Sequence, residues 1–166
     1  MSELPFSIPT NNAEFRALFL ETRDLIESLW QGYSEEVMTL RPGPHPEWSV
    51  KDIIAHLCWW ETFAIARVGV LSAGLPISPI QDLDGLNKQV DALILGMPLE
   101  VVLAVFETNK KQFLHLIDQF TFEEWADETR PNFEGSSLME LVGANTFGHY
   151  YDHLDDLKAF REKQLG

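Results

Sequence analysis

Hydrophobic residues recur with a helical period along most of the chain. In the first such stretch their spacings are three, four and seven residues, which is the pattern of an amphipathic helix. These residues are Phe15, Leu18, Leu25, Ile26 and Leu29. The pattern predicts a helix over about 13–31, with Asn11 or Asn12 as its N-cap and Gly32 at its end.

Two later helices are predicted from a capping signal as well as from their period. Each follows a serine that has an acidic residue three positions later, which is the arrangement of a capping box. The two pairs are Ser49 with Asp52 and Ser137 with Glu140. The helices are expected over about 50–72 and about 138–163.

A shorter amphipathic segment is predicted over about 82–95. Pro98 suits the first turn of the long helix that follows, which is expected to end near Gln119. A short helical turn is expected over 121–124. No useful length of chain alternates apolar and polar residues with period two, as a half-buried strand would. The predicted fold class is therefore all-α.

The two halves of the chain match at an offset of 88 residues. At this offset Ser49 falls on Ser137, so both capping boxes coincide, and the Glu-Glu pair at 35–36 falls on the pair at 123–124. Chance similarity between amphipathic helices is the simpler alternative, but it does not explain why both signals share one offset. We infer two helix pairs related by a pseudo-two-fold axis and packed as a four-helix bundle. The segment over 82–95 then crosses from one pair to the other.

The composition predicts one globular domain spanning residues 1–166. Hydrophobic residues make up 45% of the chain and charged residues 23%, which argues against disorder. No stretch has the form of a signal peptide, and no apolar run nears the ~18 residues of a membrane span. We therefore expect a cytoplasmic protein with no membrane partner. The single cysteine, Cys58, excludes an internal disulfide and is expected to be a small core residue rather than a nucleophile.

The charge balance argues against two further kinds of partner. Twelve Lys and Arg residues stand against 26 Asp and Glu residues, which gives a net charge of −14. Such a surface repels phosphate backbones, so the sequence predicts no nucleic-acid partner. Anionic lipid is excluded for the same reason.

Three histidines are the candidates for chemistry, because each aligns in the repeat with a residue that is not histidine. His149 and His153 lie four residues apart on one predicted helix, which places their Cβ atoms about 6 Å apart on one face. His56 lies on an inward stripe of another helix. Three neutral imidazoles from two helices give a metal site with an open coordination position, as in catalytic centres.

Simpler interpretations of these histidines stay open. A single histidine on an apolar face, such as His56, is usually a hydrogen-bonded core residue. The pair of His149 and His153 is also compatible with a solvated face, since Asp152 and Asp155 lie beside it.

Four other residues are weighed as supporting groups. Glu61 is the repeat partner of His149, so it is either a hydrogen-bond acceptor or base near the site or a solvated glutamate. Trp60 either walls a pocket or packs in the core. Asn87 either binds substrate at the bundle mouth or caps a turn. Tyr150 either donates a proton or a hydrogen bond, or faces a different helix.

Two segments carry a resemblance to a known family. The segment 48–57, WSVKDIIAHL, followed by Trp60 and Glu61, resembles the second-helix signature of the DinB-like four-helix-bundle superfamily. The segment 145–153, NTFGHYYDH, is similar to its fourth-helix signature. Asp84 and Asn87 suit the branch that includes the ClbS/DfsB-like proteins. The resemblance covers nearly the whole chain.

This resemblance implies an up-down-down-up bundle with a short extra helix in the crossover, and a divalent metal held by His56, His149 and His153. Known relatives include transferases and isomerases that depend on low-molecular-weight thiols such as mycothiol or bacillithiol. ClbS/DfsB-like members are implicated in self-protection against reactive natural products, and not all of them hold a metal. The resemblance also makes a homodimer an expectation.

The leading hypothesis is a metal-dependent enzyme that performs thiol-linked transfer or hydrolytic detoxification of a small-molecule substrate. Imidazole suits zinc, nickel, copper and iron, and of these we expect zinc or nickel, with a low-molecular-weight thiol as cosubstrate. One alternative is a non-catalytic module that binds and sequesters a small molecule. Another is a structural homodimer with vestigial histidines.

Overall fold

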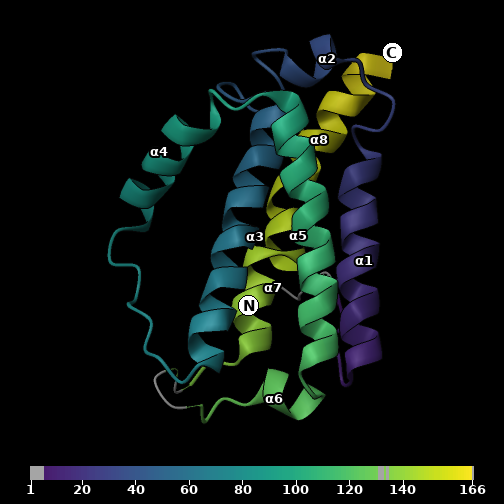
Figure 1. Cartoon of the computed structure of the whole chain (residues 1–166). Helices are drawn as coiled ribbons and strands as arrows, with labels where there is room; N and C mark the ends of the chain where they lie inside the picture. Colours follow the sequence, from purple (N-terminus) through teal and green to yellow (C-terminus); the bar gives the residue numbers. More distant parts are fainter. Residues whose placement is uncertain (1–5, 131–132, 134, 166) are drawn as a thin grey trace.

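Four long helical arms form a bundle (Figure 1), and the computed structural model describes residues 6–130, 133 and 135–165. The arms are α1 (Asn12–Ser28), α3 (Val50–Ser72), α5 (Leu99–Gln119) and the pair α7 (Leu138–Asn145) and α8 (Phe147–Leu165). In Figure 1, α1 and the α7–α8 arm rise while α3 and α5 descend, which is an up-down-down-up order. The predicted all-α four-helix bundle is confirmed, since every regular element of the described residues is a helix.

The predicted caps account for where the arms begin. Asn11 caps α1 by accepting a hydrogen bond from the Glu14 amide. The capping box of Ser49 and Asp52 is complete, and α3 has the bounds that the sequence predicted. The second capping box, at the start of α7, is complete as well. Each cap satisfies amide groups that a helix leaves without partners at its first turn.

The predicted single helix over 138–163 is wrong in one respect, because the chain breaks between α7 and α8. Thr146, with φ −131° and ψ −105°, ends α7, and its hydroxyl donates to the Val142 carbonyl. A Cβ atom at Gly148 would lie 2.8 Å from the Gly143 carbonyl oxygen. The two glycines therefore permit the close backbone approach at this kink, which sets the direction of the helix that carries two of the three candidate histidines.

Three short helices connect the arms. The crossover contains α4 (Leu83–Ile94), which lies outside the bundle (Figure 1) and packs on it through buried Val90 and Ile94. The crossover must be long because α3 and α5 run in the same direction, so the chain returns along their full length. The expected turn over 121–124 is α6 (Phe122–Ala126). The sequence analysis missed α2 (Glu35–Thr39), since five residues are too few to show a helical period.

A layer of polar side chains divides the core into two apolar clusters. Each arm contributes one fully buried residue to this polar layer: Arg23, Glu61, Asn109 and Tyr150. On one side lies a cluster that includes Ile26, Ile53, Phe106 and Leu157. On the other lies a cluster that includes Phe15, Val68, Phe113 and Val142. The polar layer therefore crosses the bundle between two separately packed halves of the core.

Among the described residues, α3 is the one helix long and apolar enough to cross a membrane, with a mean hydropathy of 1.2 over 18 consecutive residues. The sequence analysis expected no apolar stretch of this length. Of these 18 residues, 56% are buried inside the protein, and the core helix of a globular protein can have the same length and composition. This feature is therefore weak evidence for a membrane span, and a cytoplasmic location stays a prediction.

Candidate metal centre

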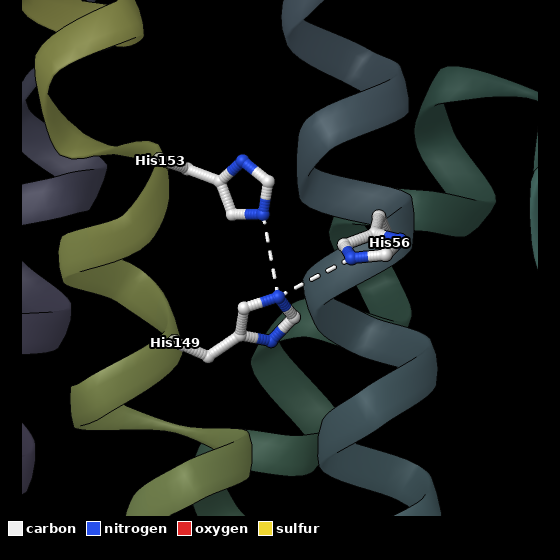
Figure 2. Close-up of side chains that lie close together, drawn as sticks. All are labelled: His56, His149 and His153. Atoms are coloured by element: carbon white, nitrogen blue, oxygen red, sulfur yellow. Dashed lines mark hydrogen bonds between the residues drawn. The ribbon is translucent and has the colours of Figure 1, made fainter. Parts of the chain in front are cut away.

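Three imidazole rings converge between α3 and α8 (Figure 2). The Nε2 atom of His149 lies 3.2 Å from Nε2 of His56 and 3.3 Å from Nε2 of His153. One nitrogen from each ring lies within 4.8 Å of the others, and no other cluster of this kind was found among the described residues. The structure thus brings together the same three histidines that the sequence analysis selected.

These separations suit a shared metal ion. In a tetrahedral site with metal–nitrogen bonds of about 2.0–2.1 Å, two nitrogen ligands lie about 3.3 Å apart. The nitrogen of His149 is at this distance from both neighbours. Hydrogen bonds alone do not explain this cluster well. A neutral imidazole nitrogen is either a donor or an acceptor, whereas the Nε2 atom of His149 faces the Nε2 atoms of both other rings. The donor set therefore fits a divalent cation.

Two helices hold the rings at this position. His149 and His153 are one turn apart on α8, and His56 comes from α3, which runs in the opposite direction. His56 is 5% exposed, and the other two rings are half-buried. The solvated-face interpretation of the pair therefore does not describe its position, since both rings point toward α3 (Figure 2).

All three rings are held in the neutral form that binds metals. Burial lowers the pKa of His56 to about 4, with a further contribution from His153. Burial, followed by the two neighbouring imidazoles, lowers the pKa of His149 to about 3. Burial also lowers the pKa of His153. A proton on any ring would place a charge in a poorly solvated site beside two further rings.

Aromatic rings and one carboxylate surround the centre. The ring of Trp48 lies 4.9 Å from that of His56 and 6.0 Å from that of His153, centroid to centroid. Asp91 of α4 places Oδ1 3.9 Å from Nδ1 of His56, and among the described residues neither atom has a hydrogen-bond partner. Sequence reasoning assigned no role to Asp91, although it lies one turn after Asn87 in the crossover.

A pocket of about 330 Å³ opens beside the centre. Residues of α3, α4, α7, α8 and the loop before α4 line it, namely His56, Trp60, Phe63, Arg67, Ile80, Leu83, Asn87, Leu141, Ala144, Asn145, His149 and Asp152. Trp60 and Asn87 therefore both line the pocket. The sequence analysis had considered Trp60 as a pocket wall and Asn87 as a substrate-binding residue. Arg67 is a lining residue that the sequence analysis did not single out.

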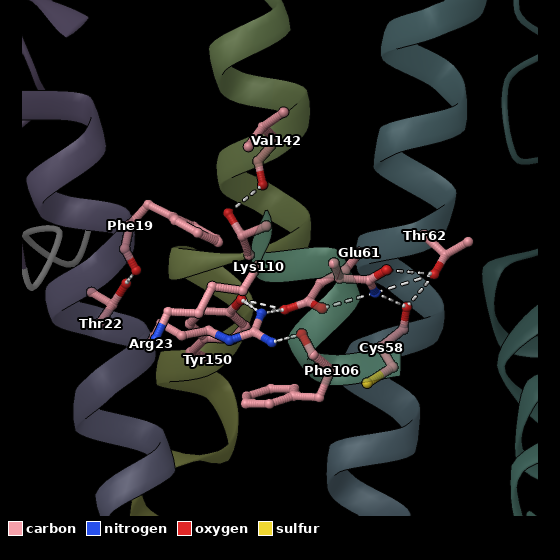
Figure 3. A network of polar contacts seen from close by, with 12 residues as sticks. Phe19, Thr22, Arg23, Cys58, Glu61, Thr62, Phe106, Lys110, Val142 and Tyr150 are labelled. Atoms are coloured by element: carbon pink, nitrogen blue, oxygen red, sulfur yellow. Dashed lines mark hydrogen bonds and ion pairs between the residues drawn. The ribbon is translucent and has the colours of Figure 1, made fainter. Parts of the chain in front are cut away.

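Glu61 and Tyr150 lie in the polar layer instead of the pocket (Figure 3). The Glu61 carboxylate accepts hydrogen bonds from Arg23 and from the Tyr150 hydroxyl, and from Asn109 Nδ2 at 3.0 Å. Arg23 also donates to the Tyr150 hydroxyl at 3.0 Å and to the Phe106 carbonyl. Burial raises the pKa of Glu61, and Arg23 opposes this. Because Arg23, Tyr150 and Asn109 all donate hydrogen bonds to the Glu61 carboxylate, we assign this carboxylate the ionised form.

Glu61 is therefore neither a solvated residue nor a direct partner of the imidazoles. Cys58 is buried, and its Sγ lies 3.7 Å from the Val102 carbonyl oxygen. Burial raises the pKa of this thiol, which keeps it protonated and unreactive.

Comparison with known proteins places this geometry in a family. The sequence profile of the DinB superfamily matches residues 18–157, and the chain belongs to that superfamily. No curated protein sequence gives a significant match.

Solved structures with the same fold share little sequence with the chain. An uncharacterised protein from Escherichia coli UTI89 has a TM-score of 0.81 at 16% identity, over 95% of this chain and 96% of that one. The colibactin self-resistance protein ClbS, in complex with a dsDNA, has a TM-score of 0.79 at 16% identity, over 94% and 98%. DfsB, described as a sibling lethal factor precursor, has a TM-score of 0.77 at 16% identity, over 95% and 98%. These likenesses show the fold.

The prediction of no nucleic-acid partner, which rested on the net charge of the chain, is wrong. A structural neighbour with the same fold has been crystallised with dsDNA, so a nucleic-acid partner is possible among related proteins. The physical reason is that net charge averages the whole surface, whereas binding depends on the local potential of one face. A charge of −14 on the whole chain does not determine that local potential.

Proposed function

Starting from membership of the DinB superfamily, we propose that this chain is a metal-dependent enzyme acting on a small molecule. In this proposal His56, His149 and His153 hold a divalent ion, and the reaction is thiol-linked transfer or hydrolysis. The observation that carries the proposal is the convergence of three Nε2 atoms at 3.2 and 3.3 Å beside an open pocket.

The chain's own residues have distinct tasks in this proposal. Three histidines supply three nitrogen ligands, which leaves a coordination position for a small molecule. When bound, a divalent ion supplies Lewis-acid chemistry, which lowers the pKa of a coordinated thiol or water. Trp48 and Trp60 limit the access of solvent to the imidazoles. Asp91 is near enough to Nδ1 of His56 to favour the tautomer whose Nε2 is free for the metal.

A low-molecular-weight thiol is the proposed cosubstrate, and zinc or nickel the proposed ion. The only cysteine of the chain, Cys58, is buried and protonated, so a thiolate nucleophile must come from outside the protein. Imidazole ligands suit both ions.

A second candidate function is sequestration of a small molecule without turnover. It is favoured by the structural neighbour ClbS, which is a self-resistance protein. Under this alternative, the pocket beside the histidines binds its ligand with the same affinity after the metal has been removed.

Metal analysis by ICP-MS tests the proposed site. We expect about one equivalent of divalent metal per chain in protein purified without added metal, and loss of that metal in His149→Ala, because two imidazoles bind far more weakly than three. His115→Ala is the matched control, since His115 is exposed and bonded to Gln119. Equal, near-zero metal in all three proteins would refute the site.

Cobalt substitution distinguishes thiol-linked transfer from hydrolysis. The visible spectrum of the cobalt-loaded protein should shift when a small thiol such as 2-mercaptoethanol is added, because a thiolate ligand changes the ligand field. An unchanged spectrum at millimolar thiol would refute thiol-linked transfer and leave hydrolysis as the proposed reaction.

A further inference from the structure

The pocket beside the candidate metal centre has a regular wall. Four side chains of α3 line it at positions 56, 60, 63 and 67, spacings of four, three and four residues that keep them on one helix face. In order they are an imidazole, two aromatic rings and a guanidinium. Positions 56 and 67 are about 16 Å apart along the helix axis. The pocket thus changes from metal-binding to apolar to cationic along its length.

The opposite walls follow the same axis. The α8 helix runs antiparallel to α3, so Asp152 lies at the histidine end, while Leu141 of α7 lies toward Arg67. The crossover also runs antiparallel to α3, with Asp91 near His56 and Ser78 near Arg67. Asp152, the one carboxylate among the described residues that line the pocket, is therefore at the end opposite the guanidinium.

Arg67 is held in place by an aromatic ring and a backbone carbonyl. Its guanidinium carbon lies 4.5 Å from the centroid of the Phe63 ring, which directs the side chain back along α3 toward the histidines. One Nη2 hydrogen bond goes to the Ser78 carbonyl. Among the described residues, no carboxylate lies within 4.0 Å of the Arg67 guanidinium, whereas Arg16, Arg23 and Arg41 each have such a partner.

The charge of Arg67 has no acidic partner in the described part of the chain, which is also true of Arg130 and Arg161. All three side chains are half-buried, but of the three only Arg67 lines the pocket. Partial burial lowers the pKa of Arg67, but arginine stays charged at any physiological pH. A charged guanidinium with free donors in a pocket is suited to an anionic group of a ligand, above all to the planar carboxylate.

We propose that Arg67 binds the carboxylate of a small substrate whose apolar body packs on Trp60 and Phe63 and whose reacting group faces the histidines. The substrate class is therefore an amphipathic organic acid. This inference rests on the proposed function for the chemistry at the histidine end, but recognition of the carboxylate does not require the metal. Among the described residues that line the pocket, Arg67 is the only lysine or arginine, so an anionic group of a ligand would bind at its guanidinium.

Binding of 4-phenylbutyrate and of its neutral amide, 4-phenylbutyramide, tests the proposal. The two probes share a ring and a chain and differ in charge. Binding is measured by isothermal titration calorimetry on the full, metal-free chain. We expect the affinity for the acid to exceed that for the amide by about 10-fold or more, because one hydrogen-bonded contact between charged groups typically contributes this much to affinity. Arg67→Gln should remove this preference by weakening the acid alone, and Arg67→Lys should retain part of it.

Arg161→Gln is the matched control. Arg161 also donates to a backbone carbonyl, that of Leu29, and also lies over an aromatic ring, that of Tyr33, but outside the pocket. Its substitution should leave the acid preference unchanged. Equal affinity for acid and amide, an acid preference that survives Arg67→Gln, or no saturable binding at millimolar probe would each overturn the proposal.

The same titrations separate this inference from the proposed function. They use the metal-free chain, so the preference for the acid is measured independently of the metal analysis. A chain that binds no metal yet prefers the acid through Arg67 would refute the metal centre and support the carboxylate site. A chain that binds metal but does not distinguish the probes would support the metal centre and refute the carboxylate site.

Discussion

Replacement of Glu61 by glutamine is expected to destabilise the protein by about 3–5 kcal/mol. Glutamine keeps the shape of the side chain, but it removes the charge and replaces one acceptor oxygen with an amide donor. Arg23 and Glu61 are both 0% exposed. Two unit charges about 4 Å apart attract by about 4 kcal/mol at an effective dielectric constant of about 20. The expected loss matches the cost of leaving one partner of a buried ion pair without the other.

The assay is urea denaturation followed by far-UV circular dichroism, with Asp118→Asn as the control. Asp118 of α5 pairs with Arg16 of α1, so this pair also joins two arms of the bundle, but the two side chains are 65% and 39% exposed. An exposed pair contributes less than about 1 kcal/mol. A loss of stability in Glu61→Gln no larger than in Asp118→Asn would refute the assignment of a buried, ionised pair.

A double substitution tests the same reasoning from the other side. Arg23→Met with Glu61→Leu removes both charges, so no unpaired charge stays in the core. Tyr150 and Asn109 lose their acceptor, which costs about 1–3 kcal/mol per unsatisfied group. We expect the double variant to be more stable than the sum of the two single variants predicts. Additive losses would show that the two charges do not interact.

Three further outcomes are expected. Gly148→Ala should cost about 1–3 kcal/mol in urea denaturation, because its Cβ meets the Gly143 carbonyl, whereas Gly69→Ala, with open space around it, should not destabilise. Ser49→Ala should cost about 1–2 kcal/mol through loss of the α3 capping box, which the same assay measures. The metal-free protein should lose about 2 kcal/mol of stability to His56 alone between about pH 7 and about pH 5, because the unfolded imidazole, with a pKa of 6.5, takes up a proton that the folded ring, with a pKa of about 4, does not. A flat stability profile over that range would contradict the neutral cluster.

Local signals of more than one kind made parts of the fold predictable. Both bounds of α3 follow from a capping box at one end and a run of turn-forming residues after the other. The three histidines were found because two of them share a helix face and all three depart from the internal repeat. Such features can be recognised in the sequence itself, either within a few residues or by comparing the two halves of the chain, so they do not depend on knowledge of tertiary contacts.

The kink at Thr146 and the polar layer depended on tertiary contacts instead. The segment around Thr146 keeps a helical period on both sides, so nothing in its pattern marks the break. The sequence did contain a signal for the polar layer that the analysis overlooked. Arg23 lies between buried Phe19 and Ile26 on α1, and Asn109 lies between buried Phe106 and Phe113 on α5. The apolar stripe predicted for α1 included Leu25, which is 39% exposed, because that choice of phase left Arg23 out.

The polar layer also determines how the candidate metal centre can be held. Tyr150 directly follows His149 on α8, so the two side chains project about 100° apart around that helix. With Tyr150 bonded to Glu61 and Arg23 inside the bundle, His149 must face the seam with α3, where His56 lies (Figures 2 and 3). An apolar residue at 150 would allow small rotations of α8, since apolar contacts have no preferred direction. The ionised layer therefore fixes the rotation of α8, and three imidazoles can converge to coordination distance only if that rotation is fixed.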